Sequence, residues 1–217
     1  HEPGANEFAV LDPSTEQRIA TLPSYSTDYA LEQVAIADEA GRAWAATTPR
    51  HRSDVLHNVY AHLIANRDRL AYVISREMGK TLAEALGEVQ YAADYVRWNA
   101  DSLLSPAGSY RENPVGGSTI LTKRAPVGTA LLIAPWNFPM AMITRKIAPA
   151  LAAGCGSVIK PAGLTPLTTL LTVELMTEAG VPRELMRVVT TNQSGAFSEA
   201  VLSDPRIRKN SFTGSVN

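Results

Sequence analysis

Residues 130–139 read ALLIAPWNFP, an apolar run that ends in two prolines around a tryptophan and an asparagine. Short apolar runs of this kind are typical of buried strands, and the prolines mark where the run stops. From here on, such runs alternate with stretches of helical spacing, which predicts a doubly wound parallel sheet of the α/β class. The expected strands are Ala130–Ala134, Ser157–Ile159, Leu185–Val189 and Lys209–Thr213, and the expected helices are Met140–Ala153, Pro166–Ala179 and Gly195–Leu202.

Candidate binding residues follow several of these runs, and parallel sheets bind ligands at the carboxyl ends of their strands. Asn137 offers an amide donor and Lys160 a cation, whereas Gly214 and Ser215 offer a small backbone and a hydroxyl where a helix should begin. Because a helix N-terminus binds phosphate well, a dinucleotide is the expected ligand. The usual G-x-G-x-x-G fingerprint does not follow the first strand, so the binding mode should differ from the common one.

The sequence before residue 105 is expected to be mainly helical, after an extended stretch over residues 7–22. The second helix is expected to begin at Ser53 or Asp54, either of which can cap a helix. On the last helix, Glu84 and Glu88 lie one turn apart, and we expect solvated surface for both rather than an acid–base pair. Apolar residues on the same helix recur at steps of four and three, which predicts a buried stripe of Leu82, Leu86, Val89, Ala93 and Val96.

Residues 105–128 have yet another character, because glycines and prolines surround the β-branched stretch GSTILTKRAPVG at 117–128. This pattern predicts an exposed strand or a hairpin arm. We therefore divide the chain into a helical part (1–104), a β arm (105–128) and the first part of the dinucleotide-binding sheet (129–217).

The bulk composition narrows the range of partners. The net charge of −1 favours neither nucleic acid nor an anionic membrane as a partner, and no apolar run reaches the ~18 residues of a transmembrane helix. The single cysteine, Cys155, allows no disulfide within the chain and fits a reducing compartment, so we expect a cytoplasmic protein. No signal peptide is visible at the N-terminus. We expect no metal site.

Four motifs in register resemble the aldehyde dehydrogenase superfamily. They are PWNFP at 135–139, LAAG at 151–154, KPA at 160–162 and FTGS at 212–215. The segment REMGKTLAEALGEV at 76–89 also fits, so the resemblance covers essentially the whole chain. A finer similarity, AMITRK at 141–146 followed by Cys155, is to the succinate-semialdehyde dehydrogenase branch.

The resemblance implies an NAD- or NADP-dependent enzyme that oxidises an aldehyde to the acid through a thiohemiacetal and a thioester. Succinic semialdehyde is the implied substrate, with another aliphatic aldehyde as the alternative. Asn137 would donate a hydrogen bond from its side-chain amide to the oxyanion. The alternative interpretation is that Asn137 is only a turn residue between two prolines. Arg145 would bind the distal carboxylate of the substrate; otherwise it is a surface arginine.

The resemblance also implies a cofactor-binding set. Lys160 would bind the adenosine ribose. Gly163 stands where many NAD-using members carry an acid, so a 2′-phosphate would not be repelled there; this fits NADP and leaves NAD open. The rest of the implied set is Ile133, Pro135, Trp136, Gly214 and Ser215.

The family nucleophile, a cysteine, and the glutamate that helps to activate it both lie downstream of FTGS, so we expect them beyond Asn217. Cys155 lies between two glycines, and we expect it to be buried and inert. The 217 residues are then about half of an enzyme and should be inactive alone. The complete enzyme is expected to be a homo-oligomer, a dimer or a tetramer, and residues 105–128 are expected to be the β arm of its oligomerisation domain. A natural, truncated and non-catalytic paralogue is the remaining alternative.

Overall fold

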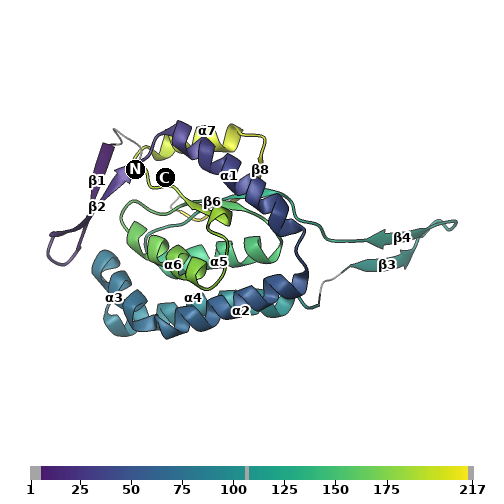
Figure 1. Cartoon of the computed structure of the whole chain (residues 1–217), viewed down its shortest axis with the longest axis horizontal. Coiled ribbons are helices and arrows are strands. Elements are labelled where there is room, and N and C mark those ends of the chain that lie inside the picture. The colour runs from purple at the N-terminus through teal and green to yellow at the C-terminus, as the bar shows by residue number, and fades with distance from the viewer. Residues whose placement is uncertain (1–5, 106–107, 215–217) are drawn as a thin grey trace.

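The computed structural model describes residues 6–105 and 108–214, and Figure 1 shows their arrangement. At the centre is a sheet of parallel strands in the order β7-β6-β5-β8, which confirms the predicted fold class. The strands are β5 (Thr129–Ile133), β6 (Ser157–Lys160), β7 (Met186–Val188) and β8 (Ile207–Phe212).

The strand order reverses at β5. From β5 the chain adds β6 and then β7 on one side, and it returns to place β8 on the other side. In this register Ile133 pairs with Lys160 of β6 and with Phe212 of β8. A reversal of this kind is where open α/β sheets bind ligands, just beyond the carboxyl ends of the strands.

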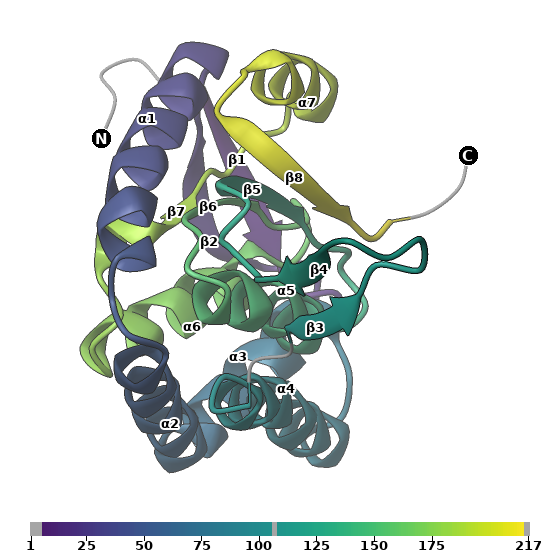
Figure 2. The same cartoon turned by 90° about the vertical axis from the view of Figure 1, so that its right-hand side faces the viewer.

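Helices cover both faces of the sheet (Figures 1 and 2). Helices α1 (Thr27–Ala45) and α7 (Ser194–Ser203) lie on one face, and α5 (Pro139–Ala152) and α6 (Pro166–Glu178) on the other. A short 3₁₀ turn, η1 (Arg183–Leu185), leads into β7. The two central strands are therefore the buried ones: β6 is buried throughout and β5 over its first four residues, whereas the edge strand β8 is mostly exposed.

A further layer of helices packs below α5 and α6: α2 (Pro49–Ala65), α3 (Arg67–Met78) and α4 (Leu82–Ser102). The predicted start of α2 is wrong by a full turn. Thr48 caps this helix by accepting a hydrogen bond from the His51 amide at 3.2 Å, with Pro49 in the first helical position. Ser53 is buried instead, and its hydroxyl donates to the Ala100 carbonyl at 2.8 Å.

The prediction for α4 needs two corrections. Val89, Ala93 and Val96 are buried as expected, but Leu82 is 52% exposed because it begins the helix. Glu84 is exposed and forms a capping box with Thr81, whereas Glu88 is buried. The reason is that α4 packs against α5 as well as α2 and α3, so its buried face is wider than the apolar stripe.

Two hairpins complete the described chain. β1 (Asn6–Leu11) pairs with β2 (Arg18–Ser24), in agreement with the predicted extended stretch. β3 (Ser109–Glu112) pairs with β4 (Thr119–Thr122) and projects from the body of the molecule (Figure 1), as a hairpin arm was expected to do. Among the described residues, no helix is both long and apolar enough to cross a membrane.

Candidate functional site

The loop after β5 carries the predicted oxyanion donor. The Ala134 amide donates to the Lys160 carbonyl at 3.2 Å, and the Thr165 hydroxyl donates to the Trp136 carbonyl at 3.4 Å. These bonds tie the loop after β5 to the loop after β6. Trp136 is 51% exposed, so its ring lines the open edge of the sheet rather than the core.

Asn137 projects from this loop with its side chain exposed. Over residues 6–105 and 108–214, the side-chain amide of Asn137 has no hydrogen-bond partner, so it is available to a ligand. Its main-chain carbonyl is held, because it accepts from Lys80 Nζ at 3.2 Å. The residue is thus anchored through its backbone and free at its functional group.

Lys80 belongs to a buried ion pair under the loop. Its Nζ lies 2.5 Å from Glu88 Oε2 and 3.9 Å from the centre of the Phe138 ring. The other oxygen of Glu88 accepts from the amides of Met140 and Ala141, at 2.9 and 3.1 Å. No side chain at the N-cap position of α5 caps this helix, so Glu88 caps it from α4.

Strand β6 ends at Lys160, which is buried, with 7% of its surface exposed. Among the described residues its ammonium makes one hydrogen bond, to the Pro161 carbonyl at 3.5 Å, and no ion pair. Burial lowers the pKa of Lys160. A buried cation without a counter-charge fits a ligand that brings hydroxyl or phosphate oxygens to it. Gly163 is exposed beside it, and a Cβ added there would meet nothing within 4 Å.

Helix α6, which follows this loop, is capped in the same way as α5. Glu77 of α3 is buried, and its two carboxylate oxygens accept from the amides of Leu167 and Thr168, both at 2.7 Å. Burial raises the pKa of Glu77 to about 7; the hydrogen bonds from Thr168 and Leu167 oppose this shift, and the charge of Glu88 adds to it.

The end of β8 completes the edge of the sheet. The Thr213 amide donates to the Ile133 carbonyl at 3.2 Å, which places Gly214 beside the end of β5. Lys146 of α5 is buried below and donates to Thr213 Oγ1 at 2.7 Å and to Ser211 Oγ at 3.2 Å. The structure therefore brings together Ile133, Pro135, Trp136, Lys160 and Gly214. Ser215 lies outside the described residues.

Two other residues singled out in the sequence lie apart from this edge. Arg145 is exposed on α5, two turns beyond Asn137, with its guanidinium 5.8 Å from the ring centre of Tyr95 on α4. Cys155 is 3% exposed and precedes β6, at the amino ends of the strands, whereas Asn137 follows β5 at the carboxyl ends. The prediction of a buried thiol is confirmed, and the thiol is at the wrong end of the sheet to serve Asn137.

Comparison with known proteins decides the family. The model of the aldehyde dehydrogenase family matches residues 1–217. The chain belongs to the aldehyde dehydrogenase family. This agrees with the parallel sheet, the departure from the common dinucleotide fingerprint and the exposed asparagine at the switch point of the sheet.

Individual relatives agree with this assignment. A succinate-semialdehyde dehydrogenase of Paenarthrobacter nicotinovorans is 45% identical over 91% of this chain and 44% of its own length. The NADP(+) succinate-semialdehyde dehydrogenase GabD of Escherichia coli is 38% identical over 95% of this chain and 42% of its own. A crystal structure of an aldehyde dehydrogenase from Brucella melitensis biovar abortus has a TM-score of 0.93 and 40% identity, over 97% of this chain and 43% of that one. The chain thus spans less than half the length of these aldehyde dehydrogenases.

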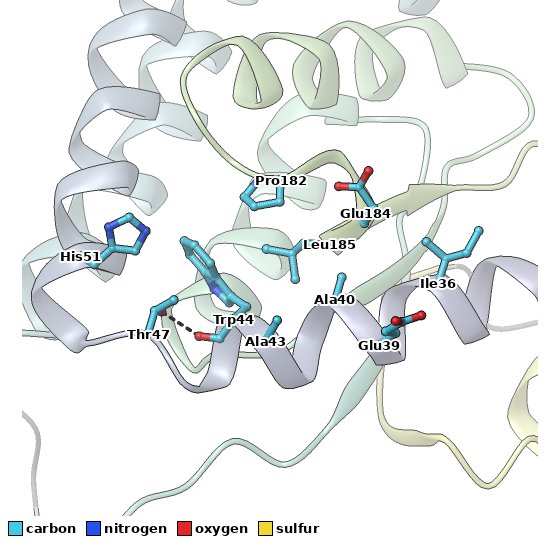
Figure 3. A pocket seen from close by; sticks show the side chains of 10 residues that line it. All are labelled: Ile36, Glu39, Ala40, Ala43, Trp44, Thr47, His51, Pro182, Glu184 and Leu185. Carbon is cyan, nitrogen blue, oxygen red and sulfur yellow. Dashed lines mark hydrogen bonds between the residues drawn. The ribbon is translucent and has the colours of Figure 1, made fainter.

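A pocket of about 610 Å³ lies elsewhere on this aldehyde dehydrogenase chain, between α1 and the segment before β7 (Figure 3). Trp44 and His51 line one end of it, and Ile36, Glu39 and Glu184 line the other. Because this pocket precedes β7 while the predicted site residues follow their strands, it lies at the opposite edge of the sheet. It contains none of those residues.

Sequence reasoning missed the buried charged side chains around the candidate site, which are those of Glu77, Lys80, Glu88 and Lys146. A signal for two of them is present. Glu77 continues the spacing of Leu70 and Ile74 at steps of four and three, and Glu88 falls three residues after Ala85 and four before Ala92. A carboxylate at a buried position of a helix needs an ion-pair or hydrogen-bond partner. A glutamate in such a position is therefore predicted to make a specific contact.

Proposed function

We propose that the full-length protein oxidises an aldehyde to a carboxylic acid with NADP or NAD, and that its substrate is succinic semialdehyde. The observation that carries the proposal is the Asn137 amide, which is exposed and without a partner among the described residues, where the strand order reverses at β5. Membership of the family and the names of the two semialdehyde dehydrogenases support the substrate class.

Asn137 acts on the charge that develops during attack on the aldehyde. A cysteine thiolate forms a sulfur–carbon bond, and the carbonyl π electrons move onto oxygen, giving a thiohemiacetal oxyanion. A fixed N–H donor stabilises this oxyanion more than the neutral carbonyl, and loss of one such donor typically raises the barrier by ~3–4 kcal/mol. A cofactor held by Lys160 and its neighbours would supply the oxidant, as a hydride acceptor for the substrate carbon. Water then hydrolyses the resulting thioester to the acid and the free thiol.

The nucleophile in this proposal is not Cys155, which is buried at the amino ends of the strands. It is the only cysteine in the 217 residues, so the reactive thiol belongs to a part of the full-length protein outside them. These residues alone should therefore be inactive in oxidation.

The cofactor preference rests on two neighbouring residues. Lys160 is a buried cation without an acidic partner among the described residues, and it would hold the adenosine ribose. Gly163 brings no carboxylate and leaves open space, so a 2′-phosphate would be neither repelled nor blocked. We therefore favour NADP, with NAD as the alternative, and assign Ile133, Pro135, Trp136 and Gly214 to the surrounding wall.

Two further assignments belong to the complete protein. Arg145 would bind the carboxylate of succinic semialdehyde with its planar guanidinium. The β3–β4 hairpin would act as an oligomerisation arm between copies of the protein. Two alternatives compete with this proposal. The protein could oxidise another aliphatic aldehyde, or it could be a truncated paralogue without catalytic activity. An intact Asn137 amide favours catalysis, because a binding module has no use for an oxyanion donor.

The test is Asn137→Ala in the full-length protein, with succinic semialdehyde and NADP+ or NAD+ in excess. We expect the single-turnover rate of cofactor reduction to fall about 10²- to 10³-fold while the cofactor Kd stays within about twofold. Asn58→Ala, an exposed asparagine on α2, is the matched control and should keep the wild-type rate. An unchanged rate in Asn137→Ala would reduce Asn137 to a turn residue.

A further inference from the structure

We propose that Lys80 and Glu88 are positioning residues that hold Asn137 in the geometry needed for the reaction. The proposal rests on the function proposed above, because it concerns the same asparagine. Neither residue touches the Asn137 amide. They act through the backbone that carries it.

Lys80 holds the loop from below at two points. Its Nζ donates to the Asn137 carbonyl at 3.2 Å and lies 3.9 Å from the centre of the Phe138 ring. The side chain is only 8% exposed, although the loop itself is open to solvent. Trp136, Asn137 and Phe138 are all exposed, so packing does little to fix them. The Thr165 hydroxyl holds the Trp136 carbonyl, and the two Lys80 contacts restrain Asn137 and Phe138.

Glu88 holds both Lys80 and the helix that follows the loop. Its fully buried carboxylate lies 2.5 Å from Lys80 Nζ through one oxygen. Through the other it accepts from the amides of Met140 and Ala141, the second and third residues of α5. The Asn137 carbonyl and the first turn of the helix that follows it are therefore tied to one buried ion pair, Lys80–Glu88.

The glutamate cap, though not the lysine that pairs with it, recurs at the neighbouring loop, which argues against an incidental contact of Glu88. Helix α6 also begins with a proline and lacks a cap from its own N-cap side chain. Glu77 accepts from its second and third amides, those of Leu167 and Thr168. Thus the carboxylate of Glu88 occupies the N-terminus of α5 and that of Glu77 the N-terminus of α6, and neither terminus is free to bind a phosphate. This fits the missing G-x-G-x-x-G after β5.

Small displacements matter at such a site. A donor must lie within hydrogen-bond distance of the developing oxyanion, and a misplacement of about 1 Å can lower a rate about 100-fold. Removal of Lys80 leaves Asn137 present but its carbonyl unanchored. The loss should therefore appear in the chemical step and only when residue 137 can donate a hydrogen bond.

A double-mutant cycle in the full-length protein tests this dependence. The variants are Lys80→Met, Asn137→Ala and the two combined, and the readout is the single-turnover rate of cofactor reduction with succinic semialdehyde. We expect Lys80→Met to lower the rate about 10- to 100-fold when Asn137 is present, and less than about twofold in the Asn137→Ala background. The KM for the aldehyde should change less than about twofold.

Two further variants keep the test decisive. Lys80→Met with Glu88→Gln leaves no unpaired buried charge, and it should show the same dependence on Asn137 if Lys80→Met alone folds poorly. Glu84→Gln is the matched control, because Glu84 lies one turn from Glu88, is exposed and contacts Thr81, and its rate should equal that of the wild type.

The outcomes separate the two proposals. An equal fall in both backgrounds, or no fall at all, would show that Lys80 does not act through Asn137, and it would overturn the positioning role alone. An unchanged rate in Asn137→Ala by itself would overturn the oxyanion function first, and the positioning role with it.

Discussion

Glu84 and Glu88 are the same residue type, one turn apart on α4, in opposite environments. Glu84 is exposed and caps its own helix, whereas Glu88 is buried, pairs with Lys80 and caps α5. At the scale of single residues, chemistry in this protein depends on which backbone groups a side chain meets. Arg145 instead meets a side chain, because its guanidinium lies 5.8 Å from the ring centre of Tyr95 on α4.

Arg145→Ala should raise the KM for succinic semialdehyde about 10-fold or more, because a charge-assisted hydrogen bond contributes ~1.5–3 kcal/mol. The KM for butanal, which has no carboxylate, should hardly change. Arg145→Lys should recover only part of the effect, since a point charge cannot replace a planar fork. The measurement is kcat/KM for both aldehydes with the full-length variants.

The control for this substitution is Arg97→Ala. Arg97 is another exposed arginine that lies over a tyrosine ring, 5.1 Å from the centre of Tyr60, and its loss should leave both aldehydes unaffected. If Arg145→Ala lowers kcat/KM equally for the charged and the neutral aldehyde, Arg145 is structural and the substrate is an unspecified aldehyde.

At the scale of elements, the N-termini of α5 and α6 organise the site. Both helices follow the loops of the candidate site, begin with a proline and take their caps from glutamates of the lower helical layer. The helices α3 and α4 therefore do more than fill the core. They set where the two loops leave the sheet, with buried Glu88 and Glu77 as the fixed points.

The cap of α6 makes the stability of the protein depend on pH. The pKa of Glu77 is raised from 4.5 to about 7, so the folded state favours the protonated form. The contribution is complete below about pH 4.5 and is lost as the pH rises through 7, with a total of about 3 kcal/mol. Glu88 is the charged group that faces Glu77, and it acts in the same direction.

We therefore expect the unfolding free energy of the wild type to fall between pH 5 and pH 8 relative to that of Glu77→Gln, which cannot ionise. Urea unfolding of the full-length proteins at several pH values measures this difference. Glu84→Gln serves as the control: the pKa of Glu84 is lowered by its hydrogen bonds to Thr81, so its contribution changes only below this range. Parallel curves for the wild type and Glu77→Gln would show that Glu77 keeps one charge state throughout.

At the scale of the whole molecule, the β3–β4 arm projects from the body and leaves most of its residues exposed to solvent (Figure 1). Tyr110 and Leu121 are cross-strand partners, and each is 75% exposed. A two-stranded hairpin is marginally stable alone in water, and its free edges invite a further strand. These features support the proposed contact with a second copy of the protein.

Leu121→Asp should therefore lower the oligomeric state of the full-length protein, because a charge would be buried without a partner in the contact between copies. Sedimentation velocity at several concentrations measures the change. Leu202→Asp is the control, since Leu202 is 49% exposed on α7 and lies outside the arm. The same sedimentation coefficient for Leu121→Asp and the wild type would remove the arm from the interface.

Local pattern was sufficient for much of the fold. The parallel strands, the helices between them and the hairpin arm were predicted within a few residues, because apolar spacing and the placement of glycine and proline are local properties. The start of α2 was not predicted correctly, because both Thr48 and Ser53 are residue types that can cap a helix. Only the tertiary structure, in which Ser53 is buried against Ala100, shows that Thr48 is the cap.

The sequence by itself determined the succession of strands and helices along the chain, and it placed Asn137, Lys160 and Gly214 at or just after the ends of their strands, where parallel sheets bind ligands. Only the tertiary structure decided what holds them. Glu88 meets amides 52 and 53 residues away, and Glu77 meets amides 90 and 91 residues away. No local pattern records these partners, because backbone amides are the same in every sequence and only the packing of α3 and α4 under the sheet helices brings them within reach.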